Sequence, residues 1–196
     1  MGDILGFHLR PYQKPHPRFA ITGFSPGSPT LKLAGKHGMI PCSISFGERY
    51  LKGHWDSVVQ GAEAAGREPP SKQDWRVVRV VVVADTDAKA RALALDGPPG
   101  QHYRRFYLPM MKAAGLMNSV KHDPSMPDSD VTVEYLVDNC WTVGSEETVL
   151  NKLGRLHKAA GGFGFLTVNN FDHLDHLQHW RASVERLGKN SLPRLP

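Results

Sequence analysis

Short runs of apolar and β-branched residues recur along the chain, and each is followed by a stretch with helical periodicity. The runs lie at residues 19–25, 39–45, 76–84 and 163–169. Each has the length of a buried strand, and the run at 76–84 is apolar at nearly every position, which is typical of a parallel strand covered on both faces. Strands that alternate with helices in this way predict an α/β fold with a parallel sheet.

The predicted helices have recognisable ends. Helical spacing of apolar residues is found, in chain order, at 30–38, 49–70, 86–95, 131–141, 143–161 and 173–187. Ser145 is expected to be an N-cap, as is Thr86 or Asp85, because these side chains accept hydrogen bonds from the first free amides of a helix. Gly38 is expected to be a C-cap, because glycine adopts the left-handed conformation that ends a helix.

A long connection separates the third strand–helix unit from the last. Residues 96–130 are rich in proline and glycine, and only the segment 103–114 favours a helix. A connection of this length is either an excursion over a functional site or partly disordered. The chain of 196 residues, 1–196, is expected to form a single domain that contains this excursion.

Charge and composition narrow the classes of function. The net charge is +5 and the pI is near 9.3, but no run of five or more basic residues occurs, so a basic surface is favoured over nucleic-acid binding. The longest strongly apolar run is far shorter than the roughly 20 residues of a membrane helix, and no signal-peptide pattern follows Met1. Two cysteines make no disulfide framework, so we expect a cytoplasmic protein without membrane contact.

The connection after the first predicted strand has the composition of a phosphate-binding turn. It reads GFSPGSPT at residues 23–30 and supplies small residues and hydroxyls just before a helix N-terminus. Glycine allows close approach of the backbone, and the first amides of a helix attract anions. The turn has neither of the common glycine-rich nucleotide fingerprints, so a capped helix after a Pro/Gly turn is the alternative.

Three ordered motifs resemble the bacterial luciferase-like, flavin-dependent monooxygenases. They read RPYQKPHPRFAITGFSPGSPTLKLAGKHGMIP, WRVVRVVVVADTDAKARA and VGSEETVLNKLGRLHKAAGGFGFLTV. The resemblance covers nearly the whole chain, from about Leu5 onward, and within the family we expect the limonene-monooxygenase-like branch to be nearest. It implies a partial TIM (β/α)8 barrel, namely the C-terminal half with about four βα units, strands five to eight.

The same resemblance implies a flavin site and a reaction. Ser25, Gly27, Ser28 and Thr30 match the turn that holds the FMN phosphate in this family. The implied activity uses reduced FMN and O2 to insert one oxygen atom into a small organic substrate. The family's catalytic groups come largely from the N-terminal half of the barrel, so no catalytic residue is assigned.

The resemblance also implies partners. A flavin reductase would supply reduced FMN, and a half-barrel with open sheet edges is expected to form a homo-oligomer or to associate with a missing N-terminal half. The alternative function is a non-catalytic flavin-binding or assembly protein that keeps the half-barrel.

Other groups could carry chemistry. The helix at 173–187 places His173, His176 and His179 at spacings that could seat a metal, although a polar helix surface is favoured and no metal site is predicted. Arg79 interrupts an apolar strand and requires an anionic partner if it is buried. It could meet flavin, substrate or a carboxylate, but a structural ion pair, or a place near the entry of the strand, is favoured. Arg104, Arg105, Tyr103 and Tyr107 belong either to a segment that closes over the flavin or to an ordinary basic helix.

Overall fold

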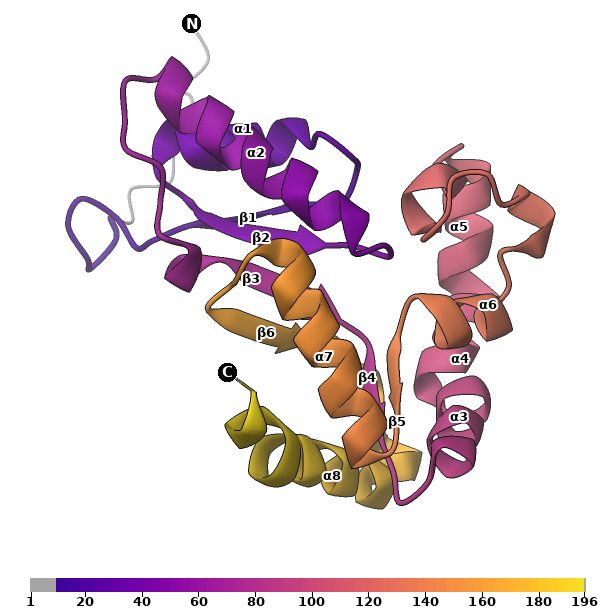
Figure 1. Ribbon diagram of the computed structural model, residues 1–196. Coiled ribbons are helices and arrows are strands. Elements are labelled where there is room, and N and C mark those ends of the chain that lie inside the picture. The colour runs from indigo at the N-terminus through magenta and orange to yellow at the C-terminus, as the bar shows by residue number, and fades with distance from the viewer. Residues whose placement is uncertain (1–9, 196) are drawn as a thin grey trace, which may run out of the picture.

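Four parallel strands form the main sheet of the computed structural model, which describes residues 10–195. The order across the sheet is β1-β2-β3-β6, with bounds Ala20–Gly23, Ile40–Ile44, Arg76–Arg79 and Phe165–Val168. All three neighbouring pairs are parallel, so the predicted α/β class with a parallel sheet is confirmed. The four strands come from the four runs in which the sequence predicts them (Figure 1).

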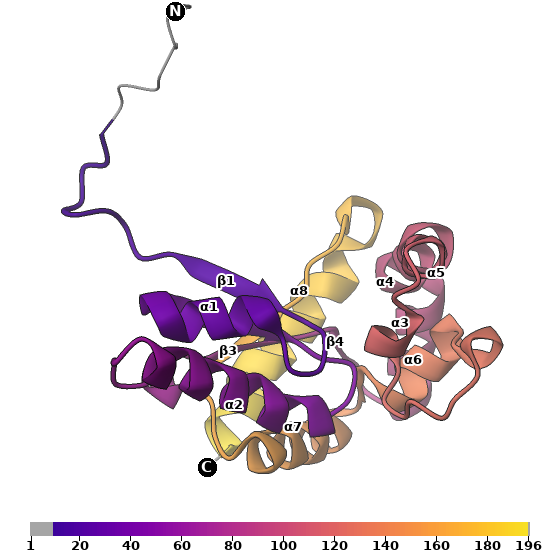
Figure 2. The same ribbon diagram turned by 90° about the horizontal axis from the view of Figure 1, so that it is seen from above.

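Helices cover one face of this sheet. The helices α1 (Pro29–His37), α2 (Arg49–Ala64) and α7 (Glu146–Ala160) lie over it, while α8 (Leu177–Arg186) packs near the β4 strand described below (Figures 1 and 2). Ser43 and Val77 point to the helical side and are fully buried. The opposite face is open at both edges, where Thr22 of β1 is exposed and the Phe165 side chain of β6 is 48% exposed.

Two shorter strands form a second sheet. The predicted strand at 76–84 is interrupted at Val80, and the chain continues as β4 (Val81–Val83), which pairs in parallel with β5 (Thr142–Gly144). The backbone amide of Thr142 also donates to the Val80 carbonyl over 2.9 Å. The β5 strand was not predicted, because its three residues directly precede the strong start signal of α7.

The remaining helices form a separate layer beside β4 and β5. They are α3 (Asp87–Asp96), α4 (Pro98–His102), α5 (Leu108–Ala113) and α6 (Val133–Asn139) (Figure 1). A π-helical turn, Tyr103–Tyr107, joins α4 to α5, so the helix predicted at 103–114 begins earlier, at Pro98. Prolines at the first turn of α4 are tolerated there, because those amides lack helical partners in any case.

The predicted helix ends are confirmed where they were assigned. The Thr86 and Ser145 hydroxyls accept hydrogen bonds from the amides of Lys89 and Thr148. Gly38 ends α1 with a φ of 65°. Within residues 10–195, no helix combines the length and apolar content needed to cross a membrane.

Candidate functional site

The turn between β1 and α1 lies at the carboxyl end of the parallel sheet, where ligands of such folds bind. It brings Ser25, Gly27, Ser28 and Thr30 together before the first turn of α1. Gly27 has a φ of 62°, in the left-handed region that favours glycine, and it is exposed. The four residues that the sequence predicts for the site therefore share one compact turn.

Ser28 holds the turn together from inside. Its side chain is 1% exposed, and its Oγ accepts a hydrogen bond from the Leu31 amide over 3.4 Å, which caps α1. The Thr30 hydroxyl lies 2.9 Å from Ser28 Oγ and donates to the Thr22 carbonyl over 2.8 Å. A Cβ at position 23 would lie 2.2 Å from Ser28 Oγ, so Gly23 is needed for this close packing.

The outer surface of the turn fits a phosphate group. A Cβ built on Gly27 meets nothing within 4 Å, so the space above its backbone is open. Ser25 is half-buried, Thr30 is exposed, and no acidic residue stands in the first turn of α1. Small residues, hydroxyls and the positive end of a nine-residue helix are the groups that hold phosphate monoesters.

His54 supports the turn from the neighbouring helix α2. Its ring is fully buried, and its Nε2 lies 3.0 Å from the carbonyl oxygen of Ser25, to which the neutral imidazole donates. Burial lowers the pKa of His54 to about 4, against the smaller opposing effect of this hydrogen bond. Sequence reasoning missed His54, because a histidine inside an amphipathic helix carries no signal of what its ring contacts.

The stability of the protein is expected to fall in mild acid because of His54. The pKa is about 6.5 in the unfolded chain and about 4 in the fold, so the unfolded state takes up the proton first. The full contribution of His54 is present above about pH 6.5 and is lost as the pH falls toward 4, by up to about 3 kcal/mol. Urea unfolding of the protein and of His54→Gln at several pH values checks this, and an equal acid response in both would contradict it.

Aromatic side chains gather at the same edge of the sheet. Phe46 follows β2, and its ring stacks on Tyr107 and meets the edge of Tyr103. Tyr103 is 4% exposed, so the excursion is anchored in the core at this point. Arg104 pairs with Glu134 over 3.2 Å and Arg105 is exposed, which agrees with the ordinary basic helix. Closure of this segment over a flavin stays a prediction.

Arg79, at the end of β3, is buried but has no carboxylate partner. The side chain is 5% exposed, and its Nη1 donates to the carbonyl oxygens of Ser45 and Val78. Among the described residues no carboxylate lies within ion-pair distance of Arg79, so the favoured structural ion pair is not found. Burial lowers the pKa of Arg79 to about 10, which leaves the guanidinium charged at neutral pH.

The histidines near the C-terminus form no metal site. In the part of the chain that the structure describes, no group of three or more His, Cys, Asp or Glu side chains could hold a metal ion. His173 stacks on Trp180, with ring centroids 4.4 Å apart and planes at 6°. The stacked pair therefore serves packing between the 169–176 segment and α8.

Comparison with known proteins relates the chain to monooxygenases. The model of the family "luciferase-like monooxygenase" matches residues 3–162. The chain is 36% identical to 3,6-diketocamphane 1,6-monooxygenase of Pseudomonas putida over 179 residues, 91% of this chain and 47% of that protein. It is 28% identical to limonene 1,2-monooxygenase of Rhodococcus erythropolis over 166 residues, 82% of this chain and 39% of that protein.

A solved structure agrees with the sequence relationship. The oxygenating constituent of 3,6-diketocamphane monooxygenase from Pseudomonas putida, described as a type II Baeyer–Villiger monooxygenase in complex with FMN, superposes with a TM-score of 0.83. The match has 36% identity and covers 92% of this chain and 50% of that one. The chain thus spans about half the length of the relatives it matches.

Proposed function

Because the chain belongs to the luciferase-like monooxygenase family, we propose that it is the flavin-phosphate-binding part of an FMN-dependent monooxygenase. The observation that carries this proposal is the fold relationship to the diketocamphane enzyme, whose structure was solved with FMN, over 92% of this chain. The turn at 23–30 has the composition and position that a flavin phosphate needs.

Each residue of the turn would contribute to phosphate binding in a different way. Ser25 would donate its hydroxyl, Thr30 would donate its hydroxyl in place of its hydrogen bond to the Thr22 carbonyl, and Gly27 would admit the phosphate close to its backbone amide. Ser28 would act through the turn, since its buried hydroxyl caps α1 and orders Thr30. His54 would fix the backbone of Ser25 from below.

The chemistry itself would come from the cofactor. Reduced FMN, when bound, supplies the electrons that activate O2, so that one oxygen atom enters a small organic substrate and the other leaves as water. The chain would orient the phosphate at the turn and place the aromatic rings of Phe46 and Tyr107 at the same edge of the sheet. A flavin reductase in the same cytoplasm would supply the reduced cofactor.

We further propose that the four-stranded sheet is one half of a TIM barrel, strands five to eight. Its open face carries the partly exposed side chains of Phe165 and Arg76, with the guanidinium 4.7 Å from the ring centre. In a closed barrel this face would be the interior. A second copy of the chain, or the other half of the barrel, would cover it.

Flavin titration tests the proposal. We expect saturable binding of oxidised and reduced FMN at micromolar concentrations, followed by flavin fluorescence or absorbance. Ser25→Ala and Thr30→Val should each weaken binding about tenfold, because each removes a hydroxyl from a charged ligand. Ser129→Ala, at an exposed serine of the turn Asp128–Asp130, is the matched control and should bind as the unaltered protein does.

A non-catalytic flavin-binding half-barrel is the second candidate, favoured by the open sheet face. Turnover separates the two candidates. Monooxygenation of a bicyclic ketone with reduced FMN and O2 supports the enzyme, whereas tight FMN binding without product supports the binding protein. Absence of FMN binding in both redox states contradicts both.

A further inference from the structure

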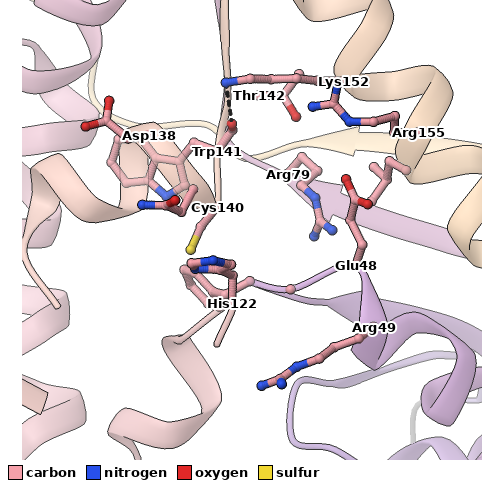
Figure 3. Close-up of a pocket in the computed structure, with 14 residues that line it drawn as sticks. Glu48, Arg49, Arg79, His122, Asp138, Cys140, Trp141, Thr142, Lys152 and Arg155 are labelled. Atoms are coloured by element: carbon pink, nitrogen blue, oxygen red, sulfur yellow. Dashed lines mark hydrogen bonds between the residues drawn. The ribbon is translucent and has the colours of Figure 1, made fainter. Parts of the chain in front are cut away.

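A cavity of about 350 Å3 lies on the helical side of the sheet, beyond the end of β3. It is lined by the start of α2, the segment 152–156 of α7 and the segment 138–142 (Figure 3). None of the residues of the turn at 23–30 lines it. The cavity is therefore separate from the site proposed for the flavin phosphate.

Cationic side chains outnumber carboxylates in this cavity. Arg49, Arg79, Lys152 and Arg155 line it, against Glu48 and Asp138. The Asp138 carboxylate is already engaged, because it accepts two hydrogen bonds from Arg91, at 2.9 and 3.0 Å. The local field thus favours a negatively charged ligand.

Arg79 is the group in the cavity whose charge is least satisfied. Figure 3 shows its guanidinium pointing into the hollow, with Glu48 on one side and His122 and Cys140 on the other. Its Nη1 donates to the carbonyl oxygens of Ser45 and Val78, and in residues 10–195 no group accepts from its Nε or Nη2. The buried guanidinium donates only to neutral acceptors, and the nearby Glu48 carboxylate offsets its loss of hydration only in part, so a bound anion would stabilise it further.

The other cations differ from Arg79 in how they are held. The half-buried Lys152 amine donates to the Val143 carbonyl over 3.0 Å, so it is fixed at the wall. Arg155 is exposed and pairs with no carboxylate among the described residues. Arg155 is thus available to close over a ligand that Arg79 holds from below.

We propose that this cavity is a binding site for the oxyanion of a small molecule, a phosphate or a carboxylate, held by Arg79 from the floor and Arg155 from the rim. Two features support an oxyanion in particular. The free Nε–H and Nη2–H groups of a guanidinium match two oxygens of one phosphate or carboxylate. The positive end of the sixteen-residue helix α2 begins at this cavity with no side-chain cap.

Glu48 is expected to oppose anion binding in this cavity. Its carboxylate lies near the guanidinium and stabilises the charged form of Arg79, but it is exposed and forms no ion pair within the described residues. It therefore competes with an external anion for Arg79. Neutralising Glu48 should strengthen anion binding, whereas a purely structural arginine would give no such effect.

Calorimetric titration of the purified chain without flavin tests the proposal, with inorganic phosphate and succinate as separate probes. We expect saturable binding of at least one probe at about millimolar concentrations, which also tells a phosphate from a carboxylate ligand. Arg79→Met should weaken binding of the probe at least about tenfold, and Arg155→Gln should weaken it about threefold. Glu48→Gln should strengthen binding of the probe about threefold. Arg18→Gln, at an exposed arginine paired with Asp74 near the amino ends of the strands, should bind unchanged.

If Arg79→Met fails to fold, Arg155→Gln and Glu48→Gln still test the proposal, because both substitutions alter exposed side chains. Binding of neither probe, or equal affinities in the unaltered protein, Arg155→Gln and Glu48→Gln, would overturn the proposal. Loss of probe binding in Ser25→Ala with retention in Arg155→Gln would also overturn it, since the anion would then occupy the turn. Because no flavin is present, these outcomes are independent of whether FMN binds.

Discussion

Replacing Gly35 with alanine is expected to lower the free energy of unfolding by about 3 kcal/mol, because α1 and α2 touch through their backbones. A Cβ at Gly35 would lie 1.9 Å from the carbonyl oxygen of Val58. The contact is reciprocal, since a Cβ at Gly61 would lie 1.9 Å from the Lys32 carbonyl oxygen. Neither backbone can yield without separating the helices, so Gly61→Ala should have a similar cost.

Urea unfolding measures this effect, and the chain contains a matched control. Gly154 lies within α7, and a Cβ there meets nothing within 4 Å. Gly154→Ala should therefore be neutral or stabilise the protein by about 0.5–1 kcal/mol through helix propensity. If Gly35→Ala and Gly154→Ala unfold alike, the close packing of α1 on α2 is not present in solution. Because α1 starts at the proposed phosphate turn, Gly35→Ala should weaken FMN binding as well.

Replacing Trp75 with alanine is expected to cost about 3–5 kcal/mol of stability, the other large effect in this fold. The indole is fully buried beneath the helices, with its ring centre 5.0 Å from that of Trp55. Its Nε1 donates to the hydroxyl of Ser43 over 2.9 Å, and Ser43 is itself fully buried. The substitution leaves a cavity between the helices and the strands β2 and β3, and it leaves the Ser43 hydroxyl without its donor.

Two further substitutions serve as comparisons for the stability cost of Trp75→Ala. Trp75→Phe keeps most of the volume and loses the hydrogen bond, so a cost of about 1–3 kcal/mol is expected. Phe106→Ala removes an aromatic ring that is 56% exposed and should change stability by less than about 0.5 kcal/mol. Equal thermal unfolding of Trp75→Ala and Phe106→Ala would contradict the assignment of Trp75 to the core.

The positions of the main-sheet strands and several helix ends could be predicted from the sequence because the signals are local. Each strand of the main sheet is a short apolar run, and α1, α3 and α7 begin or end at residues with known capping chemistry, namely Gly38, Thr86 and Ser145. The turn at 23–30 could be predicted for the same reason, since small residues, hydroxyls and a helix start follow one another along the chain, while its role in holding a phosphate stays a prediction.

Features that depend on tertiary contacts could not be predicted in this way. The pairing of β4 with β5 joins segments about 60 residues apart, and three residues of β5 carry no strand pattern of their own. The direction of the Ser28 hydroxyl, inward to the cap, follows from the packing against Gly23. His54 carries no signal in the sequence, and Arg79 stands out only as a charge in an apolar strand; the carbonyl oxygens beside both come from the fold.

The central claim is that the turn at 23–30 recognises the phosphate of FMN, and a comparison of FMN with riboflavin tests it most directly. The two flavins differ only in the phosphate, so the ratio of their dissociation constants isolates the contribution of the turn. We predict that the unaltered chain binds FMN at least about tenfold more tightly than riboflavin, and that the ratio falls toward one in the double variant Ser25→Ala, Thr30→Val. An equal affinity of the unaltered chain for both flavins, or a ratio that the double variant leaves unchanged, would contradict the claim.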